Sequence, residues 1–174
     1  MQEKRNVILV GMPGVGKTTV GVLLAERLGF AFMDTDITIQ TRERRRLQQI
    51  IDSDGLTAFR RVEERAILSI SVYAHVIATG GSVVYSEKAV RHLKSGGTIC
   101  HLDADSDCLL SRIDNMDSRG IAIPPGQSYV SLYDERHPLY IQSADFTIAT
   151  NKLTPGQVVR AITNILQNRF CYPI

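Results

Sequence analysis

The chain has 174 residues, of which 44% are hydrophobic and 22% charged, and its formal net charge is +2. This length suits one domain with a sizeable core, and the composition excludes intrinsic disorder and the membrane-spanning classes. The near-neutral charge lacks the basic excess of a nucleic-acid-binding protein. We therefore expect one domain over residues 1–174, with no nucleic-acid partner and no membrane partner.

Short apolar runs alternate with segments of helical period from end to end. This rhythm indicates an α/β protein whose parallel sheet is covered by helices on both faces. In the first half we expect, in order, a strand at 7–10, a helix at 17–28, a strand at 30–33, an Arg-rich helical stretch ending at 52–55, and a helix with core residues from Phe59 to Ile70.

The second half continues the alternation as far as the C-terminal helix. The loop at 115–127 is longer than an ordinary connection, so we interpret it as a lid. We expect Pro138 to disturb the helix that contains it and to leave Arg136 near the break. The other expected elements are a strand at 76–78, a helix at 86–94 capped by Ser86, a strand at 98–102, a helix at 106–113, a strand at 146–149, and a helix that begins at Thr154-Pro155 with a capping box.

The three cysteines are odd in number and lack the CxxC spacing of a zinc or redox site. The apolar run at 7–10 is much shorter than the hydrophobic region of a signal peptide, and no run approaches the length of a membrane span. These features predict reduced thiols and a cytoplasmic protein.

The strongest local motif is GMPGVGKT at residues 11–18, a full match to GxxxxGK[ST] between a predicted strand and a predicted helix. Its glycines allow backbone N–H groups to surround a triphosphate, and the helix N-terminus adds a positive dipole end. Lys17 is expected to reach the β- and γ-phosphates, and Thr18 to hold Mg²⁺. The alternative is a glycine-rich turn that binds nothing. The predicted cofactors are ATP and Mg²⁺, and the predicted nucleotide contacts in the loop are Gly11, Gly14, Val15, Gly16, Lys17, Thr18 and Thr19.

Two further segments could indicate a different nucleotide-binding class. The sequence NKLT at 151–154 is similar to the guanine-reading NKxD of GTPases, but Thr154 stands where an Asp must accept two hydrogen bonds. We interpret this segment as a loop beside the adenine. Asp103 ends an apolar strand, and we interpret it as a turn residue rather than a metal ligand.

Four short motifs predict a site for a small anionic acceptor, and each also has a plainer interpretation. Asp34 and Asp36 follow the second strand and could order metal-bound water and accept a hydroxyl proton, or could be turn residues. Arg60 could bind a carboxylate with Glu63 holding it, or the two could form a surface ion pair. The remaining two motifs are the glycine pair of TGGS at 79–82, which could approach a ligand closely or form a plain turn, and RHPLY at 136–140, which carries Arg136.

In this order and spacing, the motifs resemble those of the shikimate kinase family, within the nucleoside monophosphate kinase-like P-loop group. The resemblance covers nearly the whole length. It implies a three-layer P-loop fold with a five-stranded parallel sheet of order 2-3-1-4-5, and transfer of the γ-phosphoryl group of ATP to the 3-hydroxyl of shikimate. It also implies a substrate-binding helical region at about 35–62, a lid at about 115–127, and a monomer or a weak homodimer.

The resemblance assigns a role to each matching residue. It makes Asp36 the hydroxyl-binding base and places Asp34 near the magnesium ion. Catalysis would involve Asp36, Lys17 and Arg119, where Arg119 is the lid arginine that closes over the phosphates. Arg112 would lie near the adenine or the phosphates. Substrate would contact Asp36, Gly80, Gly81, Arg60 and Arg136, the last two through its carboxylate.

Two departures from the family pattern bear on the acceptor. Ser82 replaces the third glycine after the third strand, and the lid reads Ser118-Arg119-Gly120-Ile121 where the family has Arg-Pro-Leu. Two alternatives therefore stay open: a related enzyme for another small hydroxy acid, such as homoserine or a sugar acid, and a nucleotide-binding domain without kinase turnover.

Overall fold

The chain folds around a parallel β-sheet of five strands within the residues that the computed structural model describes, 6–112, 123–124 and 126–172. The spatial order is β2-β3-β1-β4-β5, and every neighbouring pair is parallel. This confirms the sheet that the sequence predicts. The strands are β1 (Asn6–Val10), β2 (Ala31–Asp34), β3 (His75–Ala78), β4 (Gly97–Asp103) and β5 (Phe146–Ala149).

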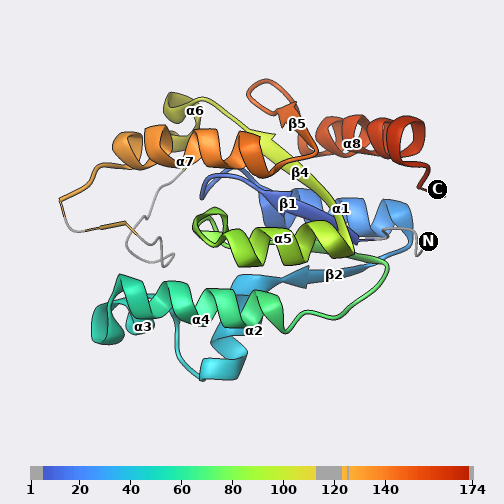
Figure 1. The fold of residues 1–174 in the computed structure, drawn as a ribbon. Helices are drawn as coiled ribbons and strands as arrows, with labels where there is room; N and C mark the ends of the chain where they lie inside the picture. The colour runs from blue at the N-terminus through green and yellow to red at the C-terminus, as the bar shows by residue number, and fades with distance from the viewer. Residues whose placement is uncertain (1–5, 113–122, 125, 173–174) are drawn as a thin grey trace.

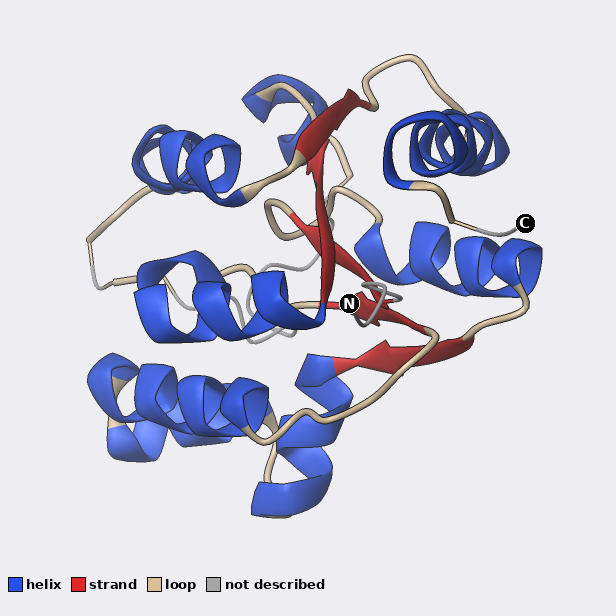
Figure 2. Cartoon of the chain, turned by 45° about the vertical axis from the view of Figure 1, so that its right-hand side comes forward, coloured by secondary structure: helices blue, strands red, loops and turns tan. Residues whose placement is uncertain are grey.

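Helices cover both faces of the sheet (Figure 1). In Figure 2 the sheet runs between α1 and α8 on one side and α5 and α7 on the other. Because both faces are covered, all five residues of β1 are buried, as expected for a central parallel strand. The helices are α1 (Lys17–Leu28), α2 (Thr35–Glu43), α3 (Leu47–Asp54), α4 (Leu56–Leu68), α5 (Glu87–Gly96), α6 (Ser106–Leu110), α7 (Tyr129–Ser143) and α8 (Pro155–Phe170), with a 3₁₀ turn η1 (Val83–Tyr85).

The helix ends follow local sequence signals. Gly29 ends α1 in the left-handed conformation, with φ 65°. The Ser86 hydroxyl accepts a hydrogen bond from the Ala89 N–H at the start of α5. Thr154 and Gln157 form the expected capping box at the start of α8. These predictions are confirmed because each depends on residues within one helical turn.

The segment between β2 and β3 forms a small helical cluster beside the β2 edge of the sheet (Figure 1). The sequence predicts one Arg-rich helical stretch here, whereas the structure has two helices, α2 and α3, with Arg44 between them at φ 53°. A continuous helix would place Ile39 and Ile50 about 16 Å apart along its axis. The turn instead brings both into one apolar cluster with Phe59 and Val62 of α4.

The expected disturbance at Pro138 is wrong. Helix α7 runs from Tyr129 to Ser143 with Pro138 inside it, and Arg136 lies in its interior with 1% of its surface exposed. Proline removes one backbone hydrogen bond from a helix. Packing of α7 against β4 and η1 compensates for that loss, because tertiary contacts supply most helical stability in proteins.

Within the described part of the chain, none of the helices has the length and apolar character needed to span a bilayer.

Candidate active site

The loop between β1 and α1 has the geometry of an anion-binding turn. Gly16 caps α1 with φ 98°, a conformation that favours glycine. Gly11 passes so close to β4 that an added Cβ would lie 2.5 Å from the carbonyl oxygen of Leu102. Helix α1 begins at Lys17, and its first N–H groups point out of the helix end. They can donate hydrogen bonds to phosphate oxygens.

Lys17 points along this loop. Its Nζ donates hydrogen bonds to the carbonyl oxygens of Gly11 at 2.7 Å and Met12 at 3.0 Å. Burial lowers the pKa of Lys17 to about 8, and the carboxylates of Asp36 and Asp34 oppose this decrease. The ammonium group therefore stays mostly protonated at neutral pH.

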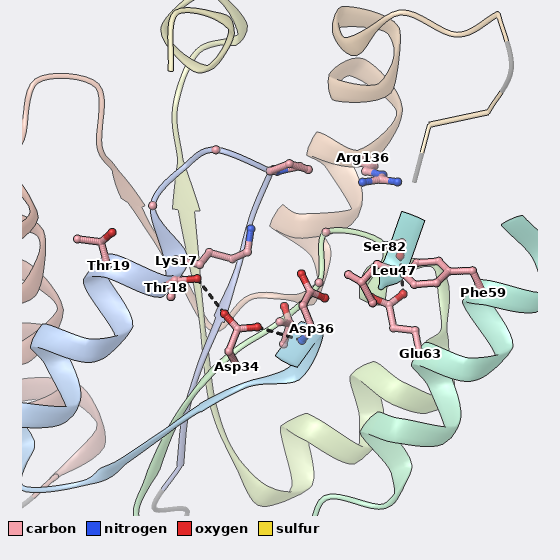
Figure 3. A pocket seen from close by; sticks show the side chains of 16 residues that line it. Lys17, Thr18, Thr19, Asp34, Asp36, Leu47, Phe59, Glu63, Ser82 and Arg136 are labelled. Carbon is pink, nitrogen blue, oxygen red and sulfur yellow. Dashed lines mark hydrogen bonds between the residues drawn. The ribbon is translucent and has the colours of Figure 1, made fainter. Parts of the chain in front are cut away.

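Thr18 and Asp34 meet at the mouth of the loop (Figure 3). The Thr18 hydroxyl donates to Asp34 Oδ2 at 2.9 Å, and Asp34 Oδ1 accepts from the Asp36 N–H at 2.9 Å, which caps α2. A hydroxyl and one carboxylate are hard oxygen ligands that fit Mg²⁺, which is usually held by few protein groups together with phosphates and water. The described residues contain no group of three or more His, Cys, Asp or Glu side chains able to form an all-protein metal site.

A cavity of about 410 Å³ opens beside the loop at the carboxyl ends of the strands. This is where open α/β sheets bind their ligands. Leu47 and Phe59, from the helical cluster, form an apolar part of its wall (Figure 3). The predicted residues that line it are Gly14, Gly16, Lys17, Thr18, Thr19, Asp34, Asp36, Gly80, Gly81 and Arg136.

The carboxyl groups of Asp36 and Glu63 both approach Gly80 at the wall of this cavity. Asp36 Oδ1 and Glu63 Oε1 each lack a hydrogen-bond partner among the described residues. An added Cβ on Gly80 would collide with Glu63 Oε1 and lie 2.9 Å from Asp36 Oδ1. Only glycine leaves room for both oxygens here, so Gly80 has a steric reason to be glycine.

Burial and a neighbouring carboxylate, Asp34 for Asp36 and Asp36 for Glu63, raise the pKa of both groups. Burial, followed by the charge of Asp34, raises the pKa of Asp36 to about 6, while Lys17 lowers it. Burial also raises the pKa of Glu63 to about 7, although the hydrogen bond from Ser82 opposes this increase. Both groups can therefore exchange a proton near neutral pH.

Arg136 reaches the cavity from α7. Its Nε donates to the Tyr85 hydroxyl at 3.2 Å. Its Nη1 would lie 3.0 Å from a Cβ added to Gly81, so the guanidinium group lies over that glycine. The Tyr140 hydroxyl donates a hydrogen bond of 2.6 Å to the carbonyl oxygen of Gly81, which fixes the backbone at that glycine.

Arg60 lines an adjoining cavity of about 250 Å³ rather than the larger one. Glu63 and Ser82 form walls of both cavities. The Arg60 guanidinium carbon lies 4.0 Å from the centroid of the Tyr85 ring. Its Nε is buried without a hydrogen-bond partner among the described residues.

Glu63, Ser82 and Tyr85 make contacts in the site that the sequence did not predict. Glu63 is expected to hold Arg60, but it accepts a 2.5 Å hydrogen bond from the Ser82 hydroxyl. Its position four residues after buried Phe59 was a usable signal, since residues at that spacing share a helix face. No sequence pattern indicated a role for Tyr85, apart from its position shortly after the glycine pair.

Among the remaining predicted residues that the structure describes, Gly11, Val15 and Arg112 do not line the larger cavity. Arg112 is exposed just after α6. Arg119 and the segment from Ser118 to Ile121 fall outside the described residues, as does most of the loop at 115–127. Asp103 ends β4 with one carboxylate oxygen 3.2 Å from His137 Nε2.

Asn151 lies beside the start of α6, where its side chain donates to Asp105 Oδ2 at 2.7 Å. Thr154, in the same segment, caps α8, as expected.

Comparisons with known proteins agree on one family. The family model described as shikimate kinase matches residues 13–167. The shikimate kinase of Mycobacterium avium is 35% identical over 162 residues, covering 91% of this chain and 92% of that protein. The shikimate kinase of Thermodesulfovibrio yellowstonii is 36% identical over 161 residues, with the same two coverages.

Solved structures give the same answer. The shikimate kinase of Acinetobacter baumannii in complex with shikimate superimposes with a TM-score of 0.84 at 32% identity, covering 95% of this chain and 94% of that one. The shikimate kinase of Aquifex aeolicus gives 0.80 at 31% identity, covering 93% and 96%. These comparisons agree with the site itself, where the loop at 11–18, the acidic pair and the arginines lie at one edge of the sheet. The chain belongs to the shikimate kinase family.

Proposed function

We propose that this chain transfers the γ-phosphoryl group of ATP to the 3-hydroxyl of shikimate. The observation that carries the proposal is the single cavity that joins a triphosphate loop to a buried carboxylate and an arginine. Lys17 and Thr18 line one end, while Asp36 and Arg136 line the other. A donor phosphate and an acceptor hydroxyl bound at these ends would lie side by side, which supplies the positioning on which phosphoryl transfer depends.

At the nucleotide end, the N–H groups of the loop and of the start of α1 would donate hydrogen bonds to the phosphates. Lys17 would exchange its bonds with the Gly11 and Met12 carbonyls for bonds with phosphate oxygens. A Mg²⁺ ion bound with the nucleotide would neutralise charge on the phosphates. Thr18 Oγ1 and Asp34 are the groups that would hold this ion, directly or through water.

At the acceptor end, Asp36 would accept a hydrogen bond from the attacking hydroxyl and take its proton. Asp36 lines the cavity, and its pKa of about 6 leaves it mostly ionised at neutral pH. A base with a pKa near the working pH combines a sufficient ionised fraction with useful basicity. Lys17, which lowers that pKa, would help to keep Asp36 ionised.

The carboxylate of shikimate would bind between Arg136 and Arg60. Arg136 already lines the cavity, whereas Arg60 lies across the shared wall formed by Glu63 and Ser82. Both guanidinium groups lie close to the Tyr85 ring, so they approach one region from two helices. A planar guanidinium fork suits a carboxylate.

A coupled ADP-release assay with shikimate, homoserine and gluconate tests the proposal. We expect turnover with shikimate, which ³¹P NMR of the product should assign to the 3-hydroxyl. Turnover with homoserine or gluconate but none with shikimate would replace the acceptor while retaining the kinase. ATP binding without acceptor-dependent ADP release for any of the three would favour a nucleotide-binding domain.

A further inference from the structure

Tyr85 ends the 3₁₀ turn η1 and contacts both arginines of the acceptor region. The centroid of its ring lies 4.0 Å from the guanidinium carbon of Arg60 and 5.2 Å from that of Arg136. Both distances are within the range of a cation–π interaction. One ring therefore contacts two cationic groups that come from different helices, α4 and α7.

The hydroxyl of Tyr85 adds a directional contact to one of the two. It accepts a hydrogen bond from Arg136 Nε at 3.2 Å and donates to Glu135 Oε1 at 2.5 Å. Glu135 also accepts from Gln127 Nε2 at 2.8 Å. Because the single hydroxyl proton points to Glu135, the oxygen lone pairs are left for Arg136.

For Arg60 the ring is a direct contact of the guanidinium group, next to the longer-range attraction of Glu63 and Glu135. Arg60 Nε is buried without a hydrogen-bond partner among the described residues. A long, flexible side chain of this kind loses rotamer freedom when it is fixed. The face of the Tyr85 ring limits where the planar guanidinium group can lie before any ligand arrives.

Resting on the proposed function, we propose that Tyr85 is a positioning residue for the carboxylate of the acceptor. It holds the guanidinium groups of Arg60 and Arg136 near each other before a ligand anion arrives, while the nearby carboxyl groups of Glu63 and Glu135 offset part of their like charge. An incoming carboxylate then meets two oriented forks, and less side-chain freedom is lost on binding. Tyr85 acts through the arginines and takes no part in proton or phosphoryl transfer.

Steady-state kinetics of ring-deleted variants test this role. Tyr85→Leu and Tyr85→Met should raise the KM for shikimate about tenfold, with kcat and the KM for ATP within about twofold of wild type. Tyr85→Phe keeps the ring and should raise the KM for shikimate only about threefold. The matched control is Tyr73→Leu, because Tyr73 is 55% exposed on the surface. This control should leave all three constants unchanged.

The methyl ester of shikimate separates positioning from general loosening of the site. It keeps the hydroxyls but lacks the negative charge, so the ring-deleted variants should lose kcat/KM for the acid and retain it for the ester. Equal losses for acid and ester, or an unchanged KM for the acid, would overturn the inference. A second test is Arg60→Ala combined with Tyr85→Leu, whose effects should add only in part, because the contact between Tyr85 and Arg136 remains when Arg60 is removed.

The outcome also shows which proposal has failed. A wild-type protein without activity on shikimate would overturn the proposed function and this inference together. An active wild type whose ring-deleted variants behave like it would overturn this inference alone.

Discussion

The two ends of the cavity differ in how well their polar groups are satisfied. At the nucleotide end, the Lys17 ammonium group, the Thr18 hydroxyl and both Asp34 oxygens have hydrogen-bond partners. At the acceptor end, one oxygen each of Asp36 and Glu63 is buried without a partner among the described residues. Buried polar groups are normally paired, so the acceptor end holds unsatisfied acceptors of a kind that the nucleotide end lacks.

The two ends also differ in how the chain builds them. The nucleotide loop is one run of eight residues, GMPGVGKT. The acceptor end combines side chains from α2, α4 and α7 with the backbone that follows β3. A contiguous site follows from local backbone rules, whereas an assembled site depends on the packing of several elements. Substitutions at each end test this difference.

The largest expected effect comes from Lys17→Ala at the nucleotide end. Turnover should fall at least about 10³-fold, and ATP affinity should fall with it, because Lys17 is expected to contact phosphate in both the ground and transition states. Coupled kinetics and ATP titration measure the two effects. Lys88→Ala is the matched control, since Lys88 is exposed on α5. Normal ATP affinity in Lys17→Ala would contradict a phosphate contact in the ground state.

Asp36→Asn should separate the two ends. We expect kcat to fall about 100- to 1,000-fold, because an amide cannot take the hydroxyl proton, while ATP affinity stays within about twofold. Rapid-quench turnover and ATP titration together check this. A kcat like that of wild type would remove Asp36 from the role of base, and a parallel loss of ATP affinity would indicate that the two ends are not separable.

Arg60→Ala should affect the acceptor alone. The KM for shikimate should rise about tenfold or more while the KM for ATP stays unchanged, because a charged partner of the carboxylate is lost. Arg65→Ala, an exposed arginine on the same helix, is the control. If both variants keep the wild-type KM, the position of Arg60 in the adjoining cavity would reflect a structural contact only.

The last prediction concerns folding stability at the acceptor end and involves no change in activity. The pKa of Glu63 is raised to about 7 in the folded protein, so folding favours its protonated form. Stability therefore decreases as pH rises from about 4.5 to 7, and the cost is fully present above pH 7. Glu63→Gln removes this titration and should stabilise the protein by roughly 3 kcal/mol more at pH 8 than at pH 4.5.

Thermal unfolding at the two pH values measures this difference, with exposed Glu26→Gln as the control. An equal change in Tm at both pH values would mean that the Glu63 carboxyl does not change its ionisation across this range. A larger stabilisation at pH 4.5 would reverse the sign and contradict the raised pKa.

The sequence by itself determined the features that depend on neighbouring residues. The loop at 11–18 carries its glycines and its lysine in one motif, and the caps at Ser86 and Thr154 act within a single helical turn. The alternation of strands and helices predicted a parallel sheet, and the family resemblance supplied its strand order. These features need little information from distant parts of the chain, because steric limits and backbone hydrogen bonds act locally.

Only the tertiary structure decided how the acceptor end is assembled. Helix α7 continues through Pro138 because its packing outweighs the missing hydrogen bond, and this buries Arg136 within the helix. Glu63 bonds to Ser82, and Arg60 lies on Tyr85, because α4 and η1 pack together. Such pairings join residues about 20 or more positions apart, and the packing of whole helices against the sheet sets them, which no local pattern encodes.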